Sequence, residues 1–228
     1  MKDRSSGKWI YLSYQLSTET PAYGGGKSLK SESVKDIEKG DSSNSLCWSF
    51  SNHLGTHIDF PSHFVNEGHT VSDYHPDFWI FQHPFLVDLS PVGPGTIIST
   101  ENCNYNRIPV ETDLILIKTG FCNLRNKAVY WKNNPGVSPE LAFVLRENFS
   151  KLRMIGFDSI STSSYTHRKI GREAHRAFLN HNRPILLLED MDLSKIDQKT
   201  VFDHIIVAPL RVENSDAAPC TVLAEINE

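Results

Sequence analysis

The stretch "SNHLGTHIDFPSHF", residues 51–64, gathers three histidines and one aspartate within fourteen positions. Side chains of this kind lose hydration when they are buried, and hydrogen bonds or charge partners must offset that loss. A solvent loop has no need of so many of them. The cluster therefore indicates a site with its own chemistry, built from His53, His57, Asp59 and His63.

Alternation along a strand predicts which of these side chains point the same way. On an extended backbone, positions 53, 55, 57 and 59 share one face, and Gly55 would leave open space between two imidazoles. Two neutral imidazoles and a carboxylate form a typical divalent-metal site, which suits zinc, manganese or iron. A helix would also place His53 and His57 together, but Gly55 and Pro61 disfavour a helix here.

Pro61 separates the fourth member of the cluster from the other three. The proline ends the extended run and is expected to turn the chain, so that His63 faces the site from a second direction. A histidine that lies beside a metal without binding it is suited to act as a general base toward water. The alternative is structural, because histidines spaced as HxxxH are often surface residues, but Asp59 and Gly55 favour the metal site.

Length and composition favour one soluble domain that spans residues 1–228. Hydrophobic residues make up 39% and charged residues 22% of the chain, and the net charge is −4 without a basic stripe, so no nucleic acid partner is expected. The apolar runs are far shorter than the ~20 residues of a membrane span, and no secretion signal is recognisable. Four cysteines without CxxC spacing are typical of reduced thiols in a cytoplasmic protein.

The remaining sequence predicts an α/β fold in layers, with a β–α–β–α–β run between residues 113 and 189. Residues 112–120 are apolar on both faces, which indicates a central strand. Helices are predicted over 138–151, opened by Ser138 and Pro139, and over 171–182. Residues 27–45 are expected to form a solvated hairpin or a mobile flap. Further strands are expected over 8–16, 46–52, 84–90, 95–100, 152–159, 184–193, 202–212 and 220–226.

The motif "HLGTHIDFPSH" matches the HxGTHxDxPxH signature of the cyclase family of metal-dependent hydrolases, which resembles bacterial kynurenine formamidase and isatin hydrolase. Other stretches follow in the family's order, so the resemblance covers nearly the whole chain. It implies a layered β/β/α swivelling domain with a mixed sheet and two main helices, assembled as a homodimer or homotetramer. The other matching stretches are "TPAYGG", "LVDLS", "DLILIKTG", "GVSPELAFVL", "IGFDSIST", "HRAF", "LLLEDMDL" and "APLRV…LAEI".

The resemblance also implies roles for individual residues of the motif. His53, His57 and Asp59 correspond to the first metal ligands, and His63 corresponds to the acid/base residue. The implied cofactor is zinc or manganese, with one or two ions per chain.

Two residues of the C-terminal half complete the implied site. They are His175 in "EAHRAF", which could also shuttle a proton, and Glu189 in "LLLED". If Glu189 is a ligand, Asp59 would bridge two ions. His167 is the competing candidate for the late histidine.

By this resemblance the chain is expected to hydrolyse the C–N bond of a formamide or cyclic amide in a small-molecule substrate. Two alternatives are a metal-dependent cyclase or lyase that stabilises an enolate, and a metal-binding protein without catalytic activity. The family's formamidases tend to carry a Pro-Gly-acid loop after a Thr-Pro-aromatic step, whereas this chain reads "YGGGKS". N-formylkynurenine, another aryl formamide, a small lactam and an ester are therefore all open as substrates.

Residues near the motif are candidates for contact with the substrate. Tyr23, Phe60 and Phe64 could line an aromatic pocket, and Thr56 could steady an oxyanion. Asp158 is expected either to support a ligand histidine or to cap a turn. The less favoured pocket residues are Trp48, Trp79 and Phe81, the histidines expected in loops are His69, His75 and His83, and the expected packed thiol is Cys47.

Overall fold

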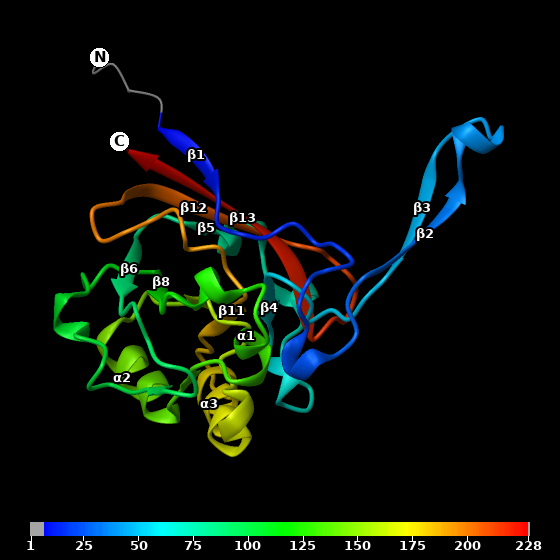
Figure 1. The fold of residues 1–228 in the computed structure, drawn as a ribbon. Helices are drawn as coiled ribbons and strands as arrows, with labels where there is room; N and C mark the ends of the chain where they lie inside the picture. The colour runs from blue at the N-terminus through cyan, green and yellow to red at the C-terminus, as the bar shows by residue number, and fades with distance from the viewer. Residues whose placement is uncertain (1–6, 228) are drawn as a thin grey trace, which may run out of the picture.

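One sheet of nine strands organises the residues that the computed structural model describes, which are 7–227 (Figure 1). Its hydrogen-bonded order is β5–β12–β13–β4–β11–β10–β8–β6, and β1 adds to β13. The strands of this sheet are β1 (Lys8–Tyr11), β4 (His57–Asp59), β5 (Ile80–Phe81), β6 (Pro84–Asp88), β8 (Leu114–Lys118), β10 (Met154–Phe157), β11 (Leu186–Glu189), β12 (Val201–Pro209) and β13 (Ala217–Asn227).

Smaller elements connect and cover the large sheet. Two pairs of strands lie outside it: β2 (Lys30–Lys35) with β3 (Ser45–Ser49), and β7 (Ile97–Ile98) with β9 (Gly136–Val137). The α-helices are α1 (Ala128–Lys132), α2 (Pro139–Asn148) and α3 (Arg168–Leu179). The 3-10 turns are η1 (Tyr23–Gly25), η2 (Ile37–Lys39), η3 (Pro61–His63), η4 (Val71–Asp73), η5 (Pro76–Trp79), η6 (Tyr105–Arg107), η7 (Phe121–Leu124) and η8 (Tyr165–His167).

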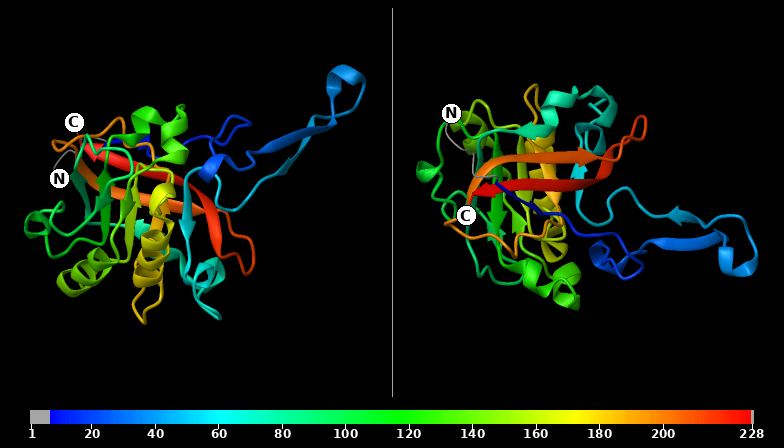
Figure 2. Two further views of the ribbon diagram at one scale, coloured as in Figure 1. Left: turned by 60° about the horizontal axis from the view of Figure 1, so that its bottom comes forward. Right: turned by 90° about the horizontal axis from the view of Figure 1, so that it is seen from above.

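Strands β6, β8, β10 and β11 form the parallel part of the sheet. Parallel neighbours require crossover connections, and α2 and α3 lie in two of these on one side of the sheet (Figure 2). Residues 114–117 of β8 are buried on both faces, as strands in the middle of a covered parallel sheet are. The central strand predicted within 112–120 is therefore confirmed.

The long strand β13 connects the parallel part to an antiparallel part. Residues 217–219 pair with β4, and the later residues of β13 pair with β12 and β1. Strand β6, at one end of the path, approaches β12, the strand next to the other end, so that the mixed sheet is nearly closed. Apolar side chains from both parts join in one continuous core.

The two main helices form where the sequence predicts them. Ser138 keeps an extended backbone and Pro139 takes the first position of α2. The third helix begins at Arg168, earlier than the predicted 171, because its polar first turn carries no apolar periodicity that would reveal the start. Within residues 7–227, no helix is long and apolar enough to cross a membrane.

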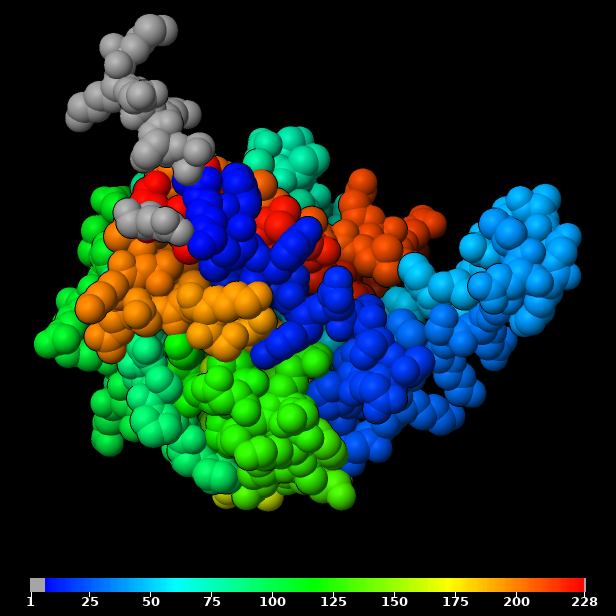
Figure 3. Space-filling model, turned by 45° about the horizontal axis from the view of Figure 1, so that its top comes forward, coloured from blue at the N-terminus to red at the C-terminus, as the bar shows by residue number. Residues whose placement is uncertain are grey.

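The β2–β3 hairpin projects away from the rest of the chain (Figures 1 and 3). A hairpin is expected within residues 27–45, but only its first strand and turn lie there. Its second strand is the one expected over 46–52, which spans Ser45–Ser49 and does not run into the motif. Cys47 is exposed on this hairpin, which corrects its interpretation as a packed thiol. Trp48 is 63% exposed and lies on the same arm.

Candidate metal centre

The motif does not form one continuous strand. Residues 51–56 form a turn, and only His57–Asp59 belong to β4. Gly55 has a φ of +71°, and a Cβ at this position would lie 2.4 Å from Leu16 Cδ2. The glycine therefore permits a tight turn packed against Leu16, and the predicted gap between two imidazoles on a strand face is wrong. His53 reaches the site from this turn.

Two strands and a helix bring the other parts of the site to β4. Strand β11 pairs with one edge of β4 so that Glu189 lies opposite His57. Strand β13 pairs with the other edge, where Ala217 lies opposite Asp59. Helix α3 carries His175, which is buried. The residues that the sequence selects from both halves of the chain are thus brought together.

Backbone carbonyls orient two histidines of the cluster. Nδ1 of His57 donates to the Gly55 carbonyl oxygen at 2.8 Å, and Nδ1 of His175 donates to the Gly171 oxygen at 2.8 Å. A carbonyl oxygen can only accept, so a proton is fixed on each Nδ1. Nε2 of His57 then lies 3.5 Å from Asp59 Oδ1, and Nε2 of His175 lies 3.2 Å from Asp59 Oδ2. Histidines that ligate metals are held in this way.

Asp59 divides its two oxygens between two groups of ligand atoms. Oδ1 faces His53 Nδ1 at 2.9 Å and His57 Nε2, whereas Oδ2 faces His175 Nε2. Oδ1 is buried, yet it accepts no well-aligned hydrogen bond from the described residues. Buried ligand atoms that lie close together without hydrogen-bonding one another suit a cation between them. The two groups are His53, His57 and Asp59, and Asp59, His175 and Glu189.

The buried charges of the cluster shift one another's protonation. Burial alone would raise the pKa of Asp59, but the surrounding imidazoles hold it well below its usual range. Burial alone would lower the pKa of His57 and of His175, but the neighbouring carboxylates outweigh it and raise these pKa values to about 9 and about 10. Protons on these imidazoles therefore balance the carboxylates, and a divalent cation would take their place.

Glu189 is fixed by donors from the segment that follows β10. The Thr162 N–H donates to Oε1 at 2.6 Å, and the Ser161 hydroxyl donates to the same oxygen at 3.3 Å. The carboxylate lies 3.5 Å from His57 Nε2 and 3.4 Å from His175 Nε2. Glu189 therefore faces both histidines, and it groups with His175 and Asp59 as a set that could hold a cation.

His63 lies beside these ligands. Pro61 opens the η3 turn that carries it, as the sequence predicts. The His63 ring lies 4.2 Å from the His53 ring, and its Nδ1 lies 3.0 Å from Oδ2 of Asp216. Burial lowers the pKa of His63, which favours the neutral form that a general base requires. Asp216 belongs to no motif, and only the pairing of β13 with β4 reveals its position.

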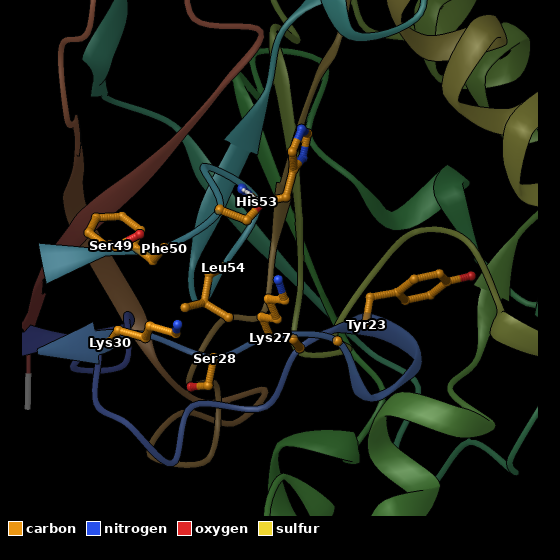
Figure 4. A pocket seen from close by; sticks show the side chains of 11 residues that line it. Tyr23, Lys27, Ser28, Lys30, Ser49, Phe50, His53 and Leu54 are labelled. Carbon is orange, nitrogen blue, oxygen red and sulfur yellow. Dashed lines mark hydrogen bonds between the residues drawn. The ribbon is translucent and has the colours of Figure 1, made fainter.

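A pocket of about 500 Å³ opens beside His53 (Figure 4). Tyr23 lines this pocket together with Lys27 and Leu54, so Tyr23 lies where a residue that contacts a substrate is expected. Phe64 packs against the ring of His175 with 4.8 Å between ring centroids. Phe64 therefore lies next to the histidine–carboxylate cluster, and Tyr23 lies on the wall of the adjoining pocket.

Thr56 and Phe60 are not available to a substrate, which corrects their predicted roles. Thr56 is buried, and its hydroxyl donates to the Asp190 carbonyl oxygen while it accepts from the Tyr14 N–H. Phe60 is fully buried and packs edge-on against Trp79 in the core. Both side chains support the ends of β4 from inside the protein.

The other residues considered lie away from the cluster. Asp158 accepts hydrogen bonds from the N–H groups of Thr119 and Gly120, so it caps the turn after β8 and does not support a ligand histidine. Trp79 and Phe81 are buried in the core. Four other histidines are exposed, namely His69, His75, His83 and His167, and His181 is exposed as well.

Fold and site together define a mixed α/β protein with a candidate metal centre beside a pocket. The chain belongs to the Cyclase family, whose model matches residues 10–164, more than half of the chain. Its relatives include kynurenine formamidases from Bacillus cereus, 28% identical over 217 residues (94% of this chain and 95% of the relative), and from Geobacillus thermodenitrificans, 29% identical over 219 residues (92% and 94%).

Solved structures share the fold. Isatin hydrolase A from Labrenzia aggregata has a TM-score of 0.78 and 22% identity, with 97% of this chain and 94% of that chain covered. Isatin hydrolase A from Ralstonia solanacearum has a TM-score of 0.79 and 16% identity, with 96% and 92% covered. These likenesses confirm the expected mixed α/β fold.

Proposed function

We propose that this chain is a hydrolase that uses a divalent metal to cleave the C–N bond of a formamide or cyclic amide. The observation that carries the proposal is the cluster in which four other ligand side chains surround Asp59, with His63 beside them. The kynurenine formamidase relatives extend along nearly the whole chain and support amide hydrolysis. They do not favour a cyclase, a lyase or a non-catalytic metal-binding protein.

The proposed metal ligands are His53, His57, Asp59, His175 and Glu189. Zinc and manganese both suit this set of imidazoles and carboxylates. Two ions are proposed because the two groups of ligand atoms share only Asp59, one oxygen to each. When bound, the metal would polarise the scissile carbonyl and lower the pKa of a water molecule.

His63 is the proposed proton carrier. It takes a proton from the attacking water and returns it to the departing nitrogen, as a neutral imidazole of lowered pKa can do. His175 was the second candidate for this role. Its Nδ1 is held by Gly171 and its Nε2 faces Asp59 and Glu189, which supports a ligand role and leaves no nitrogen for the shuttle.

The pocket beside His53 is the proposed substrate site. A volume of about 500 Å³ can hold a small aryl amide, and Tyr23 offers an aromatic wall. A substrate seated there would lie next to His53 and, through it, next to the cluster. Two substrates distinguish hydrolysis of a formamide from hydrolysis of a cyclic amide. N-formylkynurenine is the formamide, and isatin is the cyclic amide.

Metal analysis combined with hydrolysis assays tests this function. Purified protein is expected to contain a divalent metal, to lose activity on chelation and to regain it with Mn²⁺ or Zn²⁺. His63→Ala should keep the metal and lose about 10²–10⁴-fold in kcat, whereas the control His75→Ala, at an exposed histidine, should behave as wild type. A chain that binds no divalent metal would overturn the proposal, and a fully active His63→Ala would overturn the assignment of the base.

We also propose that the chain forms a homodimer or homotetramer in the cytoplasm. The projecting hairpin supports assembly, because a two-stranded hairpin is only marginally stable in water by itself. It exposes apolar side chains, which are Val34, Ile37, Leu46 and Trp48. All four cysteines are free thiols, which suits a reducing compartment.

A further inference from the structure

Asp216 connects two histidines of the site through one carboxylate oxygen. Its Oδ2 lies 3.2 Å from His53 Nε2 and 3.0 Å from His63 Nδ1, both in good hydrogen-bond geometry. Its other oxygen accepts from the Asn52 amide at 2.7 Å. The Asp216 carbonyl also accepts from the Phe60 N–H at 2.9 Å, so the backbone beside the carboxylate is tied to the end of β4.

For His53, the hydrogen bond to Asp216 determines which ring nitrogen carries the proton and which carries the lone pair. A carboxylate accepts, so the proton of a neutral His53 lies on Nε2 and is donated to Asp216. Nδ1 then carries the lone pair, and it is Nδ1 that faces Asp59 Oδ1 at 2.9 Å. A carboxylate behind a ligand histidine fixes its tautomer and raises its basicity.

For His63, the hydrogen bond to the same oxygen fixes the proton on the other ring nitrogen, Nδ1. Its Nδ1 proton is donated to Asp216, which leaves Nε2 as the acceptor. A general base needs one such lone pair held in a defined direction. The ring centroids of His53 and His63 lie 4.2 Å apart. Because both rings bond to the same oxygen of Asp216, one movement of that carboxylate would disturb both.

We propose that Asp216 is a positioning residue that holds His53 as a metal ligand and His63 as a base at the same time. This inference rests on the proposed function. Asp216 could instead be a ligand of a further cation with His53 and His63, because their atoms lie close together. The aligned hydrogen bonds to Asp216 favour positioning, since buried Asp59 Oδ1 has no such bond from the described residues.

The experiment compares Asp216→Ala and Asp216→Asn with wild type and with the control Asp77→Asn. Asp77 forms an exposed pair with His75 at 3.3 Å, which makes it a matched carboxylate–histidine pair outside the site. Mn²⁺ affinity and stoichiometry are measured by titration calorimetry, and kcat and KM on N-formylkynurenine and isatin at saturating Mn²⁺. Thermal denaturation verifies that each variant is folded.

Asp216→Ala is expected to weaken Mn²⁺ binding about 10–100-fold through His53 and to lower kcat about 10²-fold through His63, with unchanged stoichiometry and little change in KM. Asp216→Asn should recover much of the Mn²⁺ affinity and of kcat, because an amide oxygen still accepts the two N–H bonds. Asn52 can turn its own amide so that its oxygen accepts from the new amide N–H. In a His63→Ala background, Asp216→Ala should weaken Mn²⁺ binding equally but lower kcat no further.

Three results would overturn the proposal. They are wild-type affinity and kcat in Asp216→Ala, the loss of one Mn²⁺ per chain in that variant, and a further fall in kcat in the His63→Ala background. A wild-type chain that binds Mn²⁺ but hydrolyses neither substrate would contradict the proposed function instead. The affinity comparison would then still decide whether Asp216 positions His53.

Discussion

Glu189 lies directly opposite His57 in the antiparallel ladder between β4 and β11, and its Oε2 lies 3.5 Å from Nε2 of that histidine. Paired residues of a ladder project on the same side of a sheet, so the register alone aims both side chains at one place. Asp59, two residues further along β4, projects on that side as well. The pairing of two short strands thus builds most of the candidate metal centre.

Replacement of Glu189 by glutamine should weaken metal binding strongly. The amide keeps the shape of the side chain but removes the charge that faces His57 and His175. We expect the loss in affinity to exceed the about 10–100-fold caused by residues that only support ligands, and the metal content to fall from two ions toward one. Elemental analysis and titration calorimetry measure both quantities.

Glu147→Gln, at an exposed position of α2, is the matched control and should bind metal as wild type does. A Glu189→Gln variant with full metal content would show that Glu189 is not a ligand.

The predictable part of the site is the part with local spacing. His57, Asp59 and the turn at Pro61 follow from a short stretch of sequence, because strand alternation and proline act over a few residues. The position of His53 was expected for the wrong reason, since the left-handed turn at Gly55 brings it to the site. Asp216 could not be predicted, because it reaches His63 only through the pairing of β13 with β4.

Burial explains the errors among the aromatic residues. Phe60 and Phe64 flank the motif in the same way, but Phe60 faces the core whereas Phe64 packs on His175. The sequence shows that both are aromatic, but which one meets the histidine cluster depends on the η3 turn between them. Proximity to a motif along the chain is therefore a weak guide to contact with a substrate.

The metal-free protein should lose stability as the pH rises above neutral. The folded pKa values of His57 and His175, about 9 and about 10, exceed the ordinary value of 6.5. Between those values the folded chain binds more protons than the unfolded chain, so the free energy of unfolding falls as the pH increases. Thermal denaturation of chelator-treated protein at a series of pH values between about 6 and 10 measures this slope.

Metal affinity should change in the opposite direction over the same pH range, because the cation displaces these protons. His175→Gln should reduce the slope of stability with pH, since one of the two raised groups is removed. A metal-free stability that is flat between neutral pH and pH 10 would contradict the charge balance described for the cluster.

Replacement of Gly55 by alanine should destabilise the turn that carries His53. The positive φ costs about 1–2 kcal/mol for a residue with a Cβ, and the contact with Leu16 Cδ2 adds about 1–3 kcal/mol of overpacking. Gly40→Ala separates the two effects, because Gly40 also has a positive φ but a Cβ there meets nothing within 4 Å. Chemical denaturation of both variants gives the two free energies.

If the contact matters, the cost of Gly55→Ala should shrink in a Leu16→Ala background, where the methyl group is absent. Equal losses in the free energy of unfolding for Gly55→Ala and Gly40→Ala would show that only the backbone conformation contributes.

The β2–β3 hairpin is expected to form the contact between subunits on which the oligomeric state depends. Val34, Ile37, Leu46 and Trp48 are each more than half exposed on an arm that projects from the chain. Burial of this surface against another copy would contribute roughly 25 cal/mol for each Å² of apolar area removed from water. Their simultaneous replacement by serine or threonine should therefore shift the oligomer to monomers in sedimentation velocity, while the thermal midpoint of the folded domain changes little.

Phe143 and Val110 are exposed to a similar degree elsewhere, at 59% and 70%, so the double variant Phe143→Ser, Val110→Thr controls for lost surface hydrophobicity and should keep the oligomer intact. A monomeric wild type would contradict the proposed assembly. An oligomer that survives the four replacements but dissociates in the control would place the interface on the opposite part of the molecule, near α2. The two variants therefore distinguish an interface made by the hairpin from one made by the helical layer.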